Sequence, residues 1–204
     1  MSNGSCGTAS TELSMNDIES QKAELRQWAR QRRQSIPDGG ALSQSLASFA
    51  AALAVAPRRV AGYWPKGSEA DPRPLMSALM ALGHALALPV MQGAGRPLIF
   101  RQWAEGDALA PGPFQVQQPL DHSPRVVPDV VLVPLLAFDA QGWRLGYGGG
   151  FYDRTLDELR GNPQVRSVGV AFNAQKVAEV PRDAFDRPLD GILTETGLVW
   201  MERV

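Results

Sequence analysis

The stretch VVLV at residues 130–133 decides the fold, because it is apolar at every position rather than at every second one. A strand of this kind is buried on both faces, which is typical of a parallel sheet covered by helices on its two sides. Further strands are predicted along the chain, at residues 60–64 (VAGYW), 85–91, 98–103, 165–172, 191–194 and 197–201.

Helical patterns alternate with these strands. The spacing of apolar residues predicts helices from Ser14 to Pro37, at about residues 41–56, from Asp71 to Gly83, and at residues 151–160. The alternation predicts an α/β fold, a three-layer sandwich with a central, mostly parallel sheet and helices on both faces. Ligands in such folds lie in loops at the carboxyl ends of the strands. Residues 1–13 are expected to form a disordered extension, and residues 14–204 a single domain.

Composition excludes several classes of protein. The single cysteine, Cys6, rules out a disulfide framework and a four-thiolate zinc site. Twenty basic against 21 acidic side chains give no electrostatic case for a general nucleic-acid binder or a polybasic membrane anchor. Apolar runs are too short to cross a bilayer, and the first residues lack a secretory signal. We expect a cytoplasmic monomer that acts on small molecules, without a nucleic-acid or membrane partner.

A glycine run leads directly into the predicted helix at residues 151–160, in the string RLGYGGGFYDR at residues 144–154. Glycines let the backbone approach a ligand, and the first amide groups of a helix attract anions, so phosphate is the natural guest. Arg144 adds a planar set of donors suited to phosphate oxygens. The alternative is a flexible turn between strand and helix. The string matches neither GxxxxGK[ST] nor GxGxxG, so neither a P-loop nor a dinucleotide fold follows.

Three carboxylates are candidates for the same site. Asp153, just inside the helix, would either hold Mg²⁺ beside bound phosphates or simply complement the helix dipole, and the dipole is the simpler explanation. Asp190, in PLDG, is by itself a turn residue. Glu69 follows the strand at residues 60–64, where it is either a surface acid or a ligand group, and Tyr63 and Trp64 could form an aromatic wall beside it.

Four cations recur along one face of the first predicted helix: Lys22, Arg26, Arg30 and Arg33. This face could attract an anion. For Arg30 and Arg33 a solvated helix surface is the simpler explanation. His84 and His122 are isolated and receive no catalytic role, and no Ser-His-Asp set, zinc spacing or aspartate pair is visible.

Together these segments resemble one family, the 5-formyltetrahydrofolate cyclo-ligases, also called 5,10-methenyltetrahydrofolate synthetases. The resemblance runs through most of the chain after the first 15 or so residues. It rests on KAELR at residues 22–26, GYWPKGSEAD at 62–71, PLLAFD at 134–139 and the glycine string. Phe151 stands where the family often has tyrosine.

The resemblance implies a Rossmann-like fold of the cyclo-ligase type and a role in folate and one-carbon metabolism. It implies an ATP- and Mg²⁺-dependent ligase that cyclises 5-formyltetrahydrofolate to 5,10-methenyltetrahydrofolate and releases ADP and phosphate. In the mechanism that the resemblance implies, the formyl oxygen attacks the γ-phosphate, N10 then attacks the activated carbon, and phosphate leaves. Phosphoryl transfer depends on positioning and charge neutralisation, so the absence of a catalytic triad is expected.

The resemblance also implies roles for individual residues. Lys22 and Arg144 would act in catalysis, and the nucleotide would be contacted by Lys22, Arg26, Arg144, Gly146, Tyr147, Gly148, Gly149, Gly150, Phe151 and Tyr152. The folate would be contacted by Trp64, Glu69, Tyr147, Gly148, Gly149, Gly150 and Phe151. Asp153 and Asp190 would hold Mg²⁺.

Two other functions remain as alternatives. One is a non-catalytic protein of the same fold that binds folate or nucleotide, although such a protein need not keep both the phosphate and the metal positions. The other is a kinase-like phosphate-binding enzyme, which would explain the glycine string but not the segments around Glu69 and Lys22.

Overall fold

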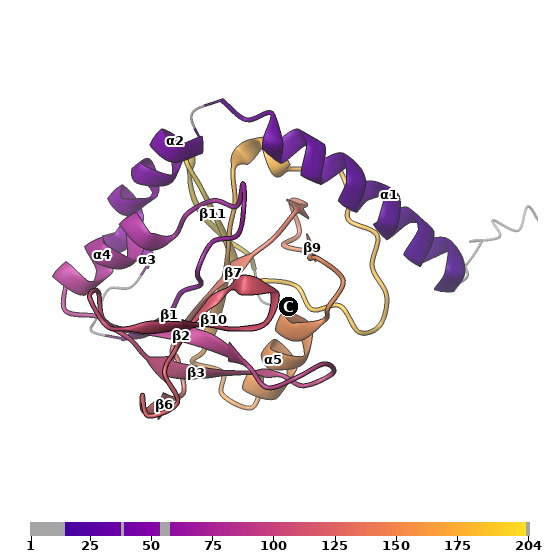
Figure 1. The fold of residues 1–204 in the computed structure, drawn as a ribbon. Coiled ribbons are helices and arrows are strands. Elements are labelled where there is room, and N and C mark those ends of the chain that lie inside the picture. Colours follow the sequence, from indigo (N-terminus) through magenta and orange to yellow (C-terminus); the bar gives the residue numbers. More distant parts are fainter. Residues whose placement is uncertain (1–14, 38, 54–57, 203–204) are drawn as a thin grey trace, which may run out of the picture.

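The computed structural model describes residues 15–37, 39–53 and 58–202 (Figure 1). The predicted extension at residues 1–13 lies outside these ranges, as does the predicted helix start at Ser14. Within the described ranges, no helix combines the length and apolar character needed to cross a membrane.

An eight-stranded sheet runs through the centre of the described chain. The middle five strands are parallel, and the strands beyond them at both edges are antiparallel. The prediction of a central, mostly parallel sheet is therefore confirmed. In spatial order the strands are β12 (Gly197–Trp200), β11 (Gly191–Thr194), β10 (Arg166–Val170), β7 (Val130–Pro134), β1 (Arg59–Ala61), β2 (Ala85–Met91), β3 (Leu98–Gln102) and β6 (Arg125–Val126).

Helices cover both faces of this sheet, as predicted. On one face α4 (Arg73–Ala81) connects β1 to β2 and packs with α2 (Gly39–Ser45) and α3 (Ala50–Leu53). On the other face α5 (Phe151–Leu159) connects β7 to β10 (Figure 1). Successive strand residues serve opposite layers, so Val60 belongs to the core under α4, and Ala61 to the core under α5.

The helix predicted at residues 41–56 is broken. A 3₁₀ turn, η1 (Leu46–Phe49), separates α2 from α3, and residues 54–57 lie outside the described ranges. The hydroxyls of Ser45 and Ser48 each donate to the backbone carbonyl three residues earlier, at 2.7 Å. Such local bonds accompany the 3₁₀ turn, whose residue Leu46 is buried in the core under α4.

Two smaller elements also differ from the expectation. The loop after β7 contains a short hairpin, β8 (Ala137–Phe138) and β9 (Arg144–Leu145). At the start of α4 the cap position is occupied by Pro72, while Asp71 still accepts a hydrogen bond from the backbone amide of Arg73. The remaining elements are β4 (Leu109–Pro111), β5 (Gln117–Pro119) and the 3₁₀ turns η2 (Pro113–Gln115) and η3 (Asn173–Gln175).

The first helix, α1 (Met15–Gln34), covers neither face of the sheet. It packs on η3 and β8, above the edge where the parallel strands end (Figure 1). Its buried residue Ala29 contacts a small apolar cluster with Leu136, Ala137 and Leu145. The helix therefore forms a roof over the loops at the carboxyl ends of the strands.

Candidate active site

A cavity of about 660 Å³ opens under this roof, at the carboxyl ends of β1, β2 and β7. Strands β1 and β7 are neighbours, but the chain leaves β1 toward β2 and leaves β7 toward β10. Ligands of open α/β sheets bind at such a reversal of strand order. The cavity has the size of a ligand pocket.

Most of the residues predicted for the site line this one cavity. They are Lys22, Arg26, Trp64, Glu69, Arg144, Gly146, Tyr147, Gly148, Gly149, Gly150, Phe151, Tyr152 and Asp153. The exception is Asp190. The structure thus brings the basic segment of α1, the Glu69 segment and the glycine string together, although they are far apart in the sequence.

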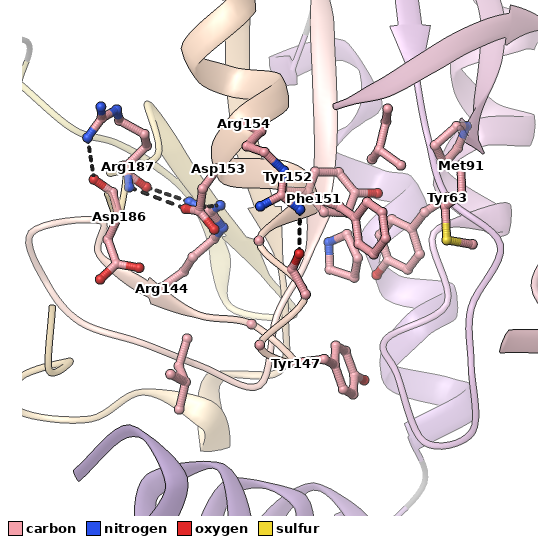
Figure 2. Close-up of a pocket in the computed structure, with 18 of the residues that line it drawn as sticks. Tyr63, Met91, Arg144, Tyr147, Phe151, Tyr152, Asp153, Arg154, Asp186 and Arg187 are labelled. Atoms are coloured by element: carbon pink, nitrogen blue, oxygen red, sulfur yellow. Dashed lines mark hydrogen bonds and ion pairs between the residues drawn. The ribbon is translucent and has the colours of Figure 1, made fainter. Parts of the chain in front are cut away.

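The glycine string forms a tight loop at the start of α5. Gly148 and Gly150 have φ angles of 94° and 62°, in the left-handed region that glycine adopts without strain. Arginines hold the loop from two sides: Arg26 Nε lies 3.3 Å from the Gly146 carbonyl, and the Arg154 guanidinium donates to the Gly149 carbonyl (Figure 2). The first amide groups of α5 have no partners within the helix, so this end of the cavity favours an anion.

Arg144 is buried beside the loop. Its Nη2 lies 2.7 Å from Asp153 Oδ1, and its Nη1 donates to the Arg187 carbonyl (Figure 2). The backbone amide of Arg187 also donates to Asp153 Oδ1, at 3.3 Å. Among the described residues Asp153 Oδ2 has no hydrogen-bond partner. Asp153 thus keeps one oxygen for another ligand.

Lys22 reaches the same region from α1. Its Nζ lies 2.6 Å from Asp183 Oδ2 and 2.6 Å from Asp186 Oδ2, although the lysine side chain is only 6% exposed. Burial opposes the charged form, but the two carboxylates outweigh burial and raise the pKa of Lys22. The hydrogen bond from Lys22 in turn lowers the pKa of Asp183.

The opposite wall is aromatic. Trp64 is half-buried; its ring meets Trp103 edge-to-face with centroids 6.2 Å apart, and the Arg73 guanidinium lies 5.0 Å from its centroid. Glu69 Oε2 accepts a 2.7 Å hydrogen bond from the Lys66 amide, which orients the carboxylate. Tyr63 is buried and donates to the Ala70 carbonyl at 2.6 Å, so it supports the loop.

Two tyrosines of the glycine string face Glu69. Burial, with the Glu69 carboxylate adding to it, raises the pKa of Tyr152 and of Tyr147. Arg33 opposes the shift at Tyr147, and Arg144 opposes it at Tyr152. Both hydroxyls therefore remain protonated at neutral pH and are available as hydrogen-bond donors.

Asp190 lies just before β11, at the amino ends of the parallel strands, whereas the cavity lies at their carboxyl ends. Its Oδ2 accepts bonds from the amide and the hydroxyl of Ser167, at 2.7 and 2.9 Å, and Oδ1 lies 3.6 Å from Arg166. The structure does not bring it together with Asp153. Its backbone continues the pairing of the sheet, because its amide donates to the Ser167 carbonyl and its carbonyl accepts from the Met201 amide.

One expectation about α1 is wrong. Arg33 is not on a solvated surface: it is buried, whereas Arg30 is exposed as expected. One side of α1 packs on loops, and the residues on that side, Lys22, Ala29 and Arg33, are buried. The spacing of Arg33 from Lys22 and Ala29, which places all three on one side of the helix, is the sequence signal that could have indicated its burial.

Sequence reasoning also missed seven charged residues that line the cavity: Glu19, Lys66, Arg154, Asp157, Asp183, Asp186 and Arg187. The string DAFDR at residues 183–187 carries two acids three positions apart, shortly before a predicted strand. No group of three or more His, Cys, Asp or Glu side chains in the described ranges is arranged to hold a metal by itself. Magnesium often uses one or two carboxylates together with substrate phosphates, so Asp153 fits that chemistry.

Comparison with known proteins identifies the family of this chain. The profile of the 5-formyltetrahydrofolate cyclo-ligase family matches residues 18–195. A 5-formyltetrahydrofolate cyclo-ligase of Mycolicibacterium smegmatis is 33% identical over 186 residues, which are 85% of this chain and 93% of the relative. One from Escherichia coli K12 is 35% identical over 147 residues, covering 69% of this chain and 79% of the relative.

Solved structures show the same fold. The 5,10-methenyltetrahydrofolate synthetase of Aquifex aeolicus superposes with a TM-score of 0.74 at 29% identity, covering 90% of this chain and 94% of the other. The synthetase of Mycoplasma pneumoniae gives 0.68 at 23% identity, over 85% and 98%. The chain therefore belongs to the 5-formyltetrahydrofolate cyclo-ligase family, a family of ligase enzymes.

Proposed function

We propose that the protein cyclises 5-formyltetrahydrofolate to 5,10-methenyltetrahydrofolate, consuming ATP with Mg²⁺ and releasing ADP and phosphate. The observation that carries the proposal is the single cavity in which the glycine loop faces the wall formed by Trp64 and Glu69. One side suits a polyphosphate and the other a planar, polar ring. A reaction between the two ligands needs both sides in one pocket.

The nucleotide would lie on the basic side. The amide groups at the start of α5 would bind its phosphates, and the cations Lys22, Arg26 and Arg144 would balance their charge. Lys22 would exchange its carboxylate partners for phosphate oxygens. Arg144 is already oriented by Asp153 and Arg187, so it can stabilise transferred charge without reorganising.

Asp153 would hold Mg²⁺ through the oxygen that faces the cavity. Bound Mg²⁺ would neutralise charge on the phosphate oxygens. Asp186 lines the same cavity and is better placed to assist than Asp190, whose position lends no support to its predicted role as second ligand.

The folate would lie on the aromatic side, with its ring against Trp64 and its polar edge at Glu69. Its formyl oxygen would then attack the γ-phosphorus, ADP would leave, N10 would attack the activated formyl carbon, and phosphate would depart. The residues supply orientation, charge balance and the hydroxyl donors Tyr147 and Tyr152, and no protein nucleophile is required.

The test is the absorbance of the methenyl product when purified protein is mixed with 5-formyltetrahydrofolate and ATP, with and without Mg²⁺. We expect product only when both ATP and Mg²⁺ are present. Binding of both ligands without product would favour the non-catalytic alternative. Binding of ATP alone would refute the folate assignment.

A pair of variants tests the two sides separately. Glu69→Gln is expected to weaken binding of 5-formyltetrahydrofolate in calorimetry and to leave ATP binding unchanged. Glu24→Gln, on the exposed face of α1, is the matched control and is expected to change neither. Equal folate binding by the two variants would contradict the role of Glu69.

We further propose a single domain over residues 14–204 that works as a cytoplasmic monomer without nucleic-acid or membrane partners. Light scattering of the purified protein tests the oligomeric state directly.

A further inference from the structure

Arg33 connects three segments that meet behind the cavity wall. Its Nε lies 3.1 Å from Ser68 Oγ, next to Glu69 in the sequence. Its Nη1 lies 3.4 Å from the Leu135 carbonyl, just after β7. Its Cζ lies 5.6 Å from the ring centroid of Tyr147, in the glycine loop. One guanidinium thus touches the Glu69 segment, the end of a central strand and the glycine loop.

The arginine itself is not part of the cavity lining, whereas Glu69 and Tyr147 are. It stands in a second layer, with its residue only 6% exposed. Among the described residues no carboxylate lies within ion-pair distance of Arg33. Burying a cation without a counter-ion costs stability even when it is hydrogen-bonded. Such a costly arrangement is typical of a functional site rather than of a core that serves stability alone.

We propose that Arg33 is a positioning residue that couples the two halves of the cavity. The proposal rests on the proposed function, which places nucleotide at the glycine loop and folate at Glu69. Nucleotide binding orders the glycine loop and holds the Tyr147 ring over the guanidinium. The same guanidinium holds Ser68 and therefore the loop that carries Glu69. Nucleotide binding then prepares the folate side, and folate binding prepares the nucleotide side by the same factor.

The planar shape of the guanidinium makes the role specific. Its Nε and Nη1 reach two partners while its Cζ lies over the ring of Tyr147, and the ammonium group of lysine cannot make all three contacts. A positive charge at this position is therefore not enough to couple the two sides of the cavity. We expect Arg33→Lys to lose most of the effect of nucleotide on folate binding.

The test is calorimetric binding of 5-formyltetrahydrofolate alone and in the presence of Mg²⁺ and a saturating β,γ-imido analogue of ATP. In the parent protein we expect the analogue to tighten folate binding by about fivefold or more, the usual range of coupling between two sites. In Arg33→Met the factor should fall close to one, while folate binding without nucleotide changes less. Arg30→Met, on the exposed face of the same helix, is the matched control and should keep the full factor.

Circular dichroism at the working temperature confirms that each variant is folded. If Arg33→Met does not fold, Ser68→Ala serves in its place, because it removes one contact of the guanidinium and leaves the helix intact; it should reduce the coupling factor partially. Unchanged coupling in a folded Arg33→Met or Ser68→Ala variant would overturn the proposal, as would a parent protein without coupling. Absence of ATP-dependent product in the parent protein would instead contradict the proposed function.

Discussion

Arg144 at the start of β9 and Asp153 in the first turn of α5 are joined by a 2.7 Å hydrogen bond that closes the glycine loop between them. The bond ties the hairpin to the helix, so the two ends of the loop keep a fixed separation. The arginine side chain is 4% exposed and the aspartate side chain 27% exposed. The pair is therefore shielded on the arginine side and open toward the cavity on the carboxylate side.

Replacing Arg144 with alanine is expected to lower turnover on the order of 10²-fold or more, the loss seen when a preorganised charge-stabilising donor is removed. Arg144→Lys should recover only part of it, because lysine cannot bond both Asp153 and the Arg187 carbonyl with the same geometry. Initial rates at saturating ATP and folate measure the effect. Near-normal turnover in Arg144→Ala would refute the role.

Asp153→Ala is expected to weaken the binding of ATP much more in the presence of Mg²⁺ than in its absence, where only the lost orientation of Arg144 contributes. The reason is that Asp153 lines the cavity and its Oδ2 has no hydrogen-bond partner among the described residues, so this oxygen would be available to Mg²⁺. Nucleotide titrations with and without Mg²⁺ separate the two effects. The proposal fails if the Mg²⁺ dependence of the variant equals that of the parent.

Asp190→Asn is the matched comparison for that experiment. Asp190 accepts hydrogen bonds from Ser167 at the amino ends of the parallel strands, away from the cavity. The variant should therefore lower the melting temperature of the protein and keep the normal Mg²⁺ dependence of ATP binding. A loss of Mg²⁺ dependence in this variant would restore the metal role that the resemblance implied.

The pairing of Lys22 with Asp183 makes part of the stability depend on pH. The pKa of Asp183 is lowered in the folded protein. Its contribution is therefore complete above the unfolded-state pKa of about 3.9 and is lost as the pH falls through the lower folded-state pKa. Asp183→Asn should cost about 1.5–3 kcal/mol at neutral pH, the range for a hydrogen bond to a charged group. Urea unfolding should show this difference shrinking at acid pH, and a constant difference would contradict the assignment.

Gly62→Ala tests whether the core can accommodate a side chain at the residue that follows β1. A Cβ at this position would lie 2.2 Å from Met76 Sδ, and Met76 is buried in the core under α4. We expect a loss of about 1–3 kcal/mol in the free energy of unfolding, as for other overpacked cores.

Gly40→Ala is its control, because α2 leaves open space at that residue. An alanine there should be neutral or stabilise the protein by up to about 1 kcal/mol. Equal stability of the two variants in urea would show that the core yields at Met76.

The strands were predictable because full burial on both faces leaves a direct trace in composition. Runs such as VVLV at residues 130–133 are typical of a strand that is buried on both faces, and the helices that cover the sheet show their own period. The break at η1 was not predictable from apolar spacing, because Leu42, Leu46, Phe49 and Leu53 keep the spacing of a continuous helix through the 3₁₀ turn. The hairpin of β8 and β9 has strands too short to leave a pattern.

The site was predictable wherever chemistry and local structure agree, as in the glycine loop before α5. The site was not predictable where the position of a residue depends on how distant segments pack together. The spacing of apolar residues shows that one side of α1 is buried but not what this side packs against. Arg33 was therefore interpreted as a surface residue, although it is buried. Asp186 and Asp190 are four positions apart, and only the path of the loop into β11 sends one to the cavity and the other to the amino ends of the parallel strands.

The bond between Lys22 and Asp183 spans 161 positions of the chain. A ribosome makes α1 well before the partner loop, so α1 cannot complete its contacts above the cavity until residue 183 has been synthesised. The contacts of α4 with η1, α3 and β2 join neighbouring segments and can form sooner. We therefore expect nascent chains halted before residue 183 to hold only part of the sheet, without β11 and β12, and an unfinished cavity.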